Sequence, residues 1–300
     1  MSGISFRMMI AAALVLGLGA LVGPTTALAQ FEVQKPEVRK GDFELEYLGA
    51  YFNGLPSLPI DAARQGHELA AYYGLTEWLE IKGAVEAERE RTEDGSFNSL
   101  KLSEIEGQAK IELLPIEGDG FGISFLGRYG ESVVSNEDES EIVFGPILKA
   151  ASGPFSITAN LFPVYSFDIK ETEIEFEEPE EEGEEATAEI EVERTPDHWN
   201  FDYALQVKHQ TWERVALGAE AYGELEDISN DNPDSGPDKH RMGPVVYVSL
   251  GEGHGHGGHG DEAGHSTGDL PSALLAFGVL FGLNDDTSDV ALKWDAEFHF

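Results

Sequence analysis

The chain has 300 residues, and its 57 aspartates and glutamates against 19 lysines and arginines give a formal net charge of −38. This strongly negative field excludes nucleic acid as a binding partner. Cysteine is absent, which excludes disulfide bonds and a lipid anchor on a cysteine.

Residues 1–29 have the three parts of a secretory signal peptide. Arg7 precedes an apolar run from Met8 to Val22, and Ala27-Leu28-Ala29 provides the small residues of a cleavage site. The alternative is an uncleaved membrane anchor, but the run is shorter than the roughly 20 residues that a spanning helix needs. We therefore expect cleavage before Gln30.

Apolar and polar residues alternate with period two through most of residues 30–300, which we interpret as a single β-domain. Leu79 and Ile81 lie on one face of such a segment, for example, and Glu80 lies on the other. We expect about twelve strands, with ten or fourteen as alternatives. The segments are Phe43–Tyr51, Leu69–Leu75, Leu79–Ala87, Ile105–Leu113, Phe121–Tyr129, Ile142–Ala150, Phe155–Leu161, Phe201–Val207, Val215–Ala221, Val246–Leu250, Leu275–Phe281 and Val290–Phe300. The segment Ile142–Ala150 fits least well, because Pro146 interrupts it.

A soluble β-sandwich also alternates, so a second criterion is needed. One face here is apolar, aromatic or glycine with few exceptions, as contact with lipid demands. Aromatic residues recur near strand ends, where amphipathic rings would lie at headgroup level: Tyr51, Trp78, Tyr129, Tyr165, Trp199 and Trp294. The sequence therefore predicts a transmembrane antiparallel up-and-down β-barrel, with membrane lipid as a partner.

The last strand alternates up to the final residue, with Trp294, Phe298 and Phe300 on its apolar face. It resembles the C-terminal assembly signal of outer-membrane β-barrels, which ends in an aromatic residue. The resemblance implies a Gram-negative-type outer membrane as the location, and the barrel assembly machinery of that membrane as a partner.

The lengths of the connections support the strand count. If both ends of the chain are periplasmic, as the resemblance implies, odd-numbered connections face outward and should be long. They are longer than the even-numbered ones, except that the periplasmic connection 251–271 is long. The outer connection 168–197 is glutamate-rich and has the pattern of a hairpin. We interpret it as a solvated charge run in preference to a collector of divalent cations or basic ligands.

Connection 251–271 is rich in glycine and contains His254, His256, His259 and His265. Neutral imidazoles suit Zn, Cu and Ni, and Asp261 and Glu262 could complete a ligand set. The spacing matches no structural zinc motif, and ordering a glycine-rich segment costs entropy. We therefore expect at most a weakly bound divalent metal and no required cofactor.

The inward face carries many charges, and we expect the lumen or ion path to be lined by Glu80, Lys82, Glu86, Glu104, Glu106, Lys110, Glu112, Arg128, Lys208, Glu220 and Asp295. Negative walls would favour cations over anions. The alternative is that ion-pair networks fill a narrow lumen. No spacing links residues such as His209 and Ser249 into a nucleophilic site, so we expect no enzymatic activity.

The chain combines a signal peptide, the stretch Lys35 to Gly41 before the first strand, and about twelve strands ending in Phe300. In this organisation it is similar to the outer-membrane proteins of phenol-degradation (MetA-pathway) clusters. That resemblance implies a transport role and no particular substrate. Two functions follow as hypotheses. One is a passive channel or small-solute transporter with an acidic, cation-favouring lumen. The other is a metal-binding or structural barrel with a closed lumen.

Overall fold

The computed structural model describes residues 31–54, 63–92, 95–133, 139–168, 173–176, 188–191, 198–226, 228, 238–251, 272–285 and 287–300. Twelve strands close into one barrel, in the order β1-β14-β13-β12-β11-β10-β7-β6-β5-β4-β3-β2, and each pairs antiparallel with its neighbours. The predicted all-β barrel of twelve strands is confirmed. The structure also contains a separate two-stranded sheet, β8-β9.

The barrel strands are about as long as tilted strands that cross a bilayer, or longer. Their bounds are β1 Phe43–Asn53, β2 Ala63–Gly74, β3 Leu79–Glu90, β4 Lys101–Leu114, β5 Gly120–Ser132, β6 Glu139–Ser152, β7 Phe155–Asp168, β10 His198–Trp212, β11 Val215–Leu225, β12 Lys239–Leu250, β13 Ser272–Gly282 and β14 Val290–His299.

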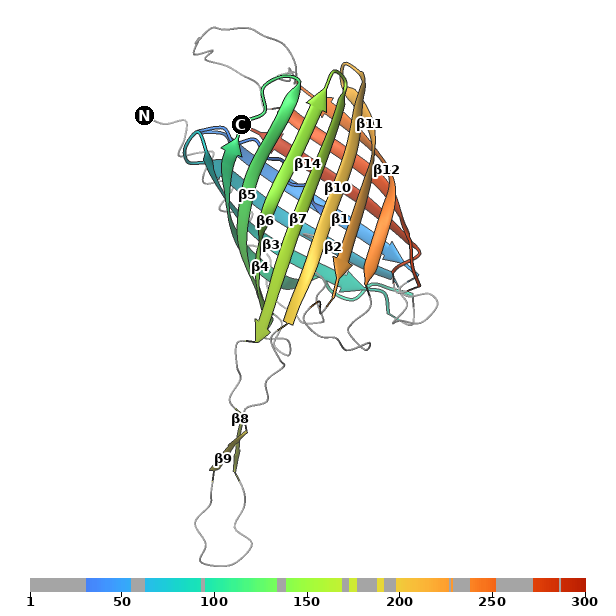
Figure 1. The fold of residues 1–300 in the computed structure, drawn as a ribbon. Helices are drawn as coiled ribbons and strands as arrows, with labels where there is room; N and C mark the ends of the chain where they lie inside the picture. The colour runs from blue at the N-terminus through green and yellow to red at the C-terminus, as the bar shows by residue number, and fades with distance from the viewer. Residues whose placement is uncertain are drawn as a thin grey trace, which may run out of the picture.

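The two ends of the barrel differ in the length of their connections (Figure 1). At one end, which we call the turn end, β1 begins and β14 ends, and short connections such as 153–154 and 213–214 join neighbouring strands. The connection 251–271, between β12 and β13, is the exception at the turn end and is long. The remaining long connections lie at the other end, the loop end. The longest of these joins β7 to β10 and contains β8 (Glu173–Phe176) paired with β9 (Ala188–Glu191). Among the described residues, no helix is long and apolar enough to cross a membrane.

First and last strands close the barrel in continuous register, from Glu44 opposite His299 to Asn53 opposite Val290. Phe300 extends this pairing, because its backbone N–H donates to the carbonyl of Phe43 at 2.9 Å. Every strand of the barrel therefore has two partners, and the barrel has no open edge.

The predicted faces agree with the structure. Large apolar side chains are exposed on the outer surface, including Ile81, Phe125, Val207, Phe277 and Leu292. Their sequence neighbours on the inner face are often charged and buried, as Lys82 and Lys293 are. An apolar exterior around a charged interior is the reverse of a soluble protein, and it is the arrangement that a lipid solvent requires.

Strand β6 is continuous despite Pro146, which made this segment the least clear in the sequence. Its pairing with β7 lapses between Val143 and Ile147 and resumes in the same register. Proline cannot donate to the ladder, so the lapse falls where the donor is missing. The backbones stay close there, since a Cβ on Gly145 would lie 2.1 Å from the carbonyl oxygen of Leu161.

Candidate functional site in the barrel lumen

We call residues 31–41 the N-terminal segment; residues 31–38 lie inside the barrel, and residues 39–41 are exposed at its end. The segment joins β1 through a tight turn at the turn end, where Asp42 N–H donates to the Arg39 carbonyl at 3.2 Å and Gly41 has a φ of 80°. The turn packs directly on β2, because a Cβ on Gly74 would lie 1.9 Å from the Arg39 oxygen. The sequence had indicated only a short stretch before the first strand, so this placement in the lumen was missed.

Phe31 anchors the inner end of the segment in an apolar patch of the lumen. Its ring lies 5.3 Å from that of Phe52 and 5.2 Å from that of Tyr222, and the Arg241 guanidinium lies 5.4 Å from the Phe31 ring centre. The patch also includes inner-face residues of several strands: Leu48, Ala50, Ala204, Leu280 and Ala291. This part of the lumen wall is therefore apolar, beside the charged residues that the sequence predicted for the lumen. The apolar inner residues of β1 were the sequence signal that something packs against them.

Ion pairs tie the middle of the segment to opposite walls. Lys35 Nζ lies 2.5 Å from Glu297 Oε2 on β14, and Glu37 forms an ion pair with Lys149 on β6. In the twelve-strand ring, β14 and β6 are separated by five strands in either direction, so they are diametrically opposed. Two residues of one segment thus reach opposite sides of the barrel, so the segment spans the lumen at this level.

The segment makes no ladder with the barrel, so its backbone needs side-chain partners. Tyr222 and Lys110 donate to the carbonyls of Phe31 and Lys35, at 3.0 and 2.9 Å. Ser124 donates to the carbonyl of Pro36. These partners lie on β11, β4 and β5, so the contacts surround the segment. A small cavity of about 20 Å³ remains beside it, lined in part by Gln34, Gln108 and Arg128. That volume suffices for about one water molecule.

Most of the predicted lumen residues are buried and take part in charge networks. Lys82 is central: its Nζ lies 2.8 Å from Glu32 of the segment, 2.6 Å from Glu68 and 3.6 Å from Glu106. Lys110 pairs with Glu80 at 2.7 Å, and Lys293 pairs with Glu220 at 2.9 Å. The interpretation as an ion-pair network thus describes much of the lumen.

The remaining predicted lumen residues have different surroundings. Arg128 Nη1 lies 3.3 Å from Glu106 Oε1. Glu112, Lys208 and Asp295 are only partly buried, and the Lys208 ammonium lies 5.3 Å from the Tyr247 ring centre. The structure thus brings the predicted lumen residues together on the inner surface of the barrel.

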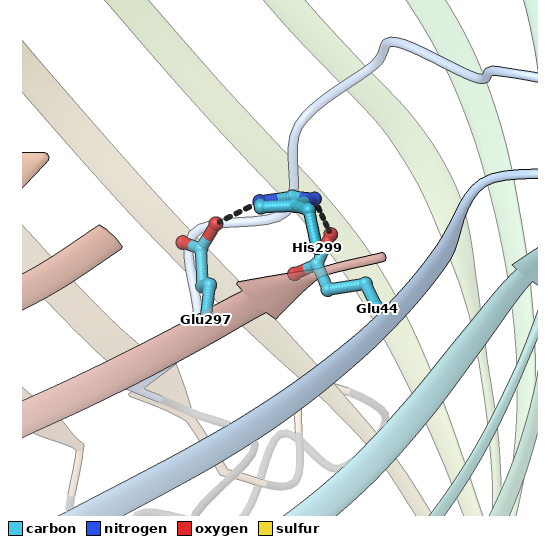
Figure 2. A group of neighbouring side chains, drawn as sticks. All are labelled: Glu44, Glu297 and His299. Carbon is cyan, nitrogen blue, oxygen red and sulfur yellow. Dashed lines mark ion pairs between the residues drawn. The ribbon is translucent and has the colours of Figure 1, made fainter. Parts of the chain in front are cut away.

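A group with the donor types of a metal site lies where β1 and β14 meet. Figure 2 shows His299 between two carboxylates: Nδ1 lies 3.3 Å from Glu44 Oε2 and Nε2 lies 3.6 Å from Glu297 Oε2. Glu297 also contacts the ammonium of Lys35. Both imidazole nitrogens therefore face acids, and a resident lysine already supplies positive charge. The contacts are those of an ion-pair network that joins the last strand to the N-terminal segment.

The four histidines of connection 251–271, predicted as a weak metal site, lie outside the described residues, as does the signal peptide. His209 and Ser249 lie on β10 and β12. The His209 ring lies 4.4 Å from Phe155, and its Nδ1 lies 3.1 Å from the Thr211 hydroxyl.

Comparison with solved structures decides the fold class. An outer membrane channel from Pseudomonas putida F1 superposes with a TM-score of 0.55 over 90% of this chain and 100% of that one, at 9% sequence identity. The fold is that of outer-membrane β-barrels. Lower similarity is found to the translocator domain of the autotransporter NalP from Neisseria meningitidis, with a TM-score of 0.43 at 11% identity over 99% of this chain and 94% of that one. No model of a known protein family matches the sequence, and no curated protein matches it.

Proposed function

We propose that this protein is a channel or transporter for small solutes in the outer membrane of a Gram-negative-type bacterium, and that the N-terminal segment closes its lumen in the state described here. The observation that supports closure is the pair of contacts from Lys35 and Glu37 to the opposed strands β14 and β6. The solved outer membrane channel with the same fold supports the transport class.

The segment has the properties of a displaceable plug. No backbone ladder joins it to the wall, and three of its side-chain contacts, those of Glu32, Lys35 and Glu37, are ion pairs. Ion pairs lose little when water enters, because each charge regains its hydration. Displacement of the segment would therefore leave a hydrated and largely polar lumen, although Phe31 and Val33 would lose apolar contacts.

The walls favour cations or neutral solutes. Carboxylates predominate on the inner face of β14 and β1 to β4, where Glu44, Glu46, Glu68, Glu80, Glu86, Glu88, Glu104, Glu106, Asp295 and Glu297 lie. Fewer bases lie on these strands: Arg64, Lys82, Arg89, Lys101, Lys110 and Lys293. A low-dielectric barrel wall focuses the resulting negative potential along the lumen and raises the local concentration of cations.

Planar-bilayer recording on the refolded chain from Gln30 onward tests this function. We expect low conductance for the wild type and a several-fold higher, cation-selective conductance when Lys35→Ala and Glu37→Ala remove both opposed contacts. Deletion of residues 31–38 should give the same result. Lys40→Ala is the matched control, because Lys40 belongs to the same segment but is exposed and lies 4.0 Å from Glu77.

A closed structural barrel is the second candidate, and the filled lumen favours it. Correctly folded deletion variants that carry no current would establish that alternative and refute the channel. A metal-binding role for His254, His256, His259 and His265 remains a proposal, which zinc or copper titration of the wild type against the fourfold alanine variant tests.

A further inference from the structure

Three glutamates with converging carboxylates lie in the lumen near the loop end. Glu86 comes from β3, and Glu104 and Glu106 come from β4. One carboxylate oxygen from each lies within 4.8 Å of the others, and the three residues are only 2%, 7% and 3% exposed. Carboxylates this close and this buried repel each other strongly unless positive charge compensates them.

An irregularity in the sheet brings Glu104 into this group. Glu86 pairs with Glu104, but the next residue, Ala87, pairs with Leu102, so Ser103 is an extra residue in β4. As a consequence Ser103 and Glu104 are both buried, although neighbours in a regular strand point to opposite faces. Bulges of this kind re-aim side chains and are common beside functional sites.

Glu104 has one carboxylate oxygen that the surrounding cations do not contact. Arg128 and Lys82 both contact Glu106, and Lys82 also serves Glu32 and Glu68. Glu104 Oε1 is buried and accepts no hydrogen bond, and among the described residues no cation lies within ion-pair distance of it. A buried carboxylate oxygen without a partner, on a residue whose carboxylate lies beside two others, is a vacant ligand position.

We propose that the lumen binds one calcium-class divalent cation through Glu86, Glu104 and Glu106. Calcium takes carboxylate oxygens at 2.3–2.6 Å, so oxygens on opposite sides of the ion are up to about 5 Å apart. The observed spread of ligand atoms fits this distance without movement of the backbone. Calcium also accepts irregular geometry, whereas magnesium demands a near-ideal octahedron and dehydrates reluctantly.

Competition sets the affinity. The ion must share Glu106 with Arg128 and Lys82, whose charges repel it. We therefore expect a dissociation constant of about 10⁻⁴ to 10⁻³ M, the range of extracellular calcium modules. The group in Figure 2 differs, since Lys35 contacts Glu297 and the His299 ring lies between the two acids.

The test is calorimetric titration of calcium chloride into the refolded chain in detergent, with magnesium chloride in parallel. It does not require the lumen to conduct, so its result is separate from that of the channel proposal. The acidic loop 168–197 is identical in every variant and contributes a common background.

Two variants remove the site in different ways. Glu104→Gln removes one ligand charge, and Gly130→Ala changes no charge but would place a Cβ 2.0 Å from Glu104 Oε1, which displaces the carboxylate. Each should weaken calcium binding at least about tenfold, as loss of metal-site residues typically does. Glu112→Gln, which removes a carboxylate at the other end of β4, should leave the affinity within about twofold.

Wild-type calcium affinity in Glu104→Gln would overturn the proposal. An equal loss of calcium affinity in Glu112→Gln would also overturn it, because calcium would then respond to the overall negative charge of the lumen and not to this site. Glu86→Gln replaces Glu104→Gln if the latter does not refold, with the same expected loss.

Discussion

Asn160 holds the backbone of Gln34 with both atoms of its side-chain amide. Its Nδ2 donates to the Gln34 carbonyl at 2.9 Å, and its Oδ1 accepts from the Gln34 N–H at 2.8 Å. Asn160 is fully buried on the inner face of β7. The Asn160 side chain thus makes the two backbone hydrogen bonds with Gln34 that a neighbouring strand would otherwise make.

Asn160→Ala should loosen the segment. The substitution leaves a buried N–H and a buried carbonyl unpaired, which costs about 1–3 kcal/mol for each group. A probe is available because the chain has no cysteine: Val33→Cys places a thiol on the segment at a buried position. We expect a membrane-impermeant thiol reagent to modify this cysteine at least several-fold faster when Asn160→Ala is also present.

Thr158→Ala is the control, as Thr158 is buried on the same face of β7. Equal modification rates in the Asn160 and Thr158 backgrounds would contradict a role of Asn160 in holding the segment.

Gly49→Ala should destabilise the barrel at its closure. Gly49 pairs with Trp294, and a Cβ at Gly49 would lie 2.2 Å from the indole ring. Displacement of a packed aromatic ring costs about 1–3 kcal/mol. Gly107→Ala is the matched control, since a Cβ there meets nothing within 4 Å. Urea titration of folded protein in lipid vesicles measures both, and the idea fails if the two substitutions cost the same.

Charge on the outer face should be tolerated only near the barrel ends. Phe277 is 57% exposed in the middle of β13, and Leu283 is 55% exposed just beyond its end. Arginine at the bilayer midplane costs about 2–4 kcal/mol, and near the interface about 0–1 kcal/mol. We expect Phe277→Arg to lower the free energy of unfolding in lipid much more than Leu283→Arg. Similar losses would show that the outer surface does not face hydrocarbon.

Phe300→Ala should reduce assembly in cells more than stability in vitro. The Phe300 ring lies 5.9 Å from that of Phe43 and is half exposed, so its loss removes little packing. If the terminal aromatic residue is recognised by the assembly machinery, the amount of folded protein in the outer membrane should fall several-fold. Phe155→Ala, which truncates a similarly exposed ring at the same end, should not have this effect.

The sequence alone predicted the strands, their faces and the closure of the barrel. Alternation is a local property, because a strand between lipid and lumen must change polarity at every residue. The segment containing Leu79 and Glu80, and the one that ends at Phe300, could therefore be interpreted without their neighbours. Loop lengths followed from the same strand count, except for the long connection 251–271.

Only the tertiary structure decided what occupies the lumen. The contacts of the N-terminal segment join residues far apart in the sequence, as Lys35 and Glu297 are, and no local pattern encodes such pairs. The bulge at Ser103 likewise depends on how β3 and β4 pair. A period of two shows which side chains point inward. Which of the charged side chains form ion pairs depends on which of them meet across the barrel.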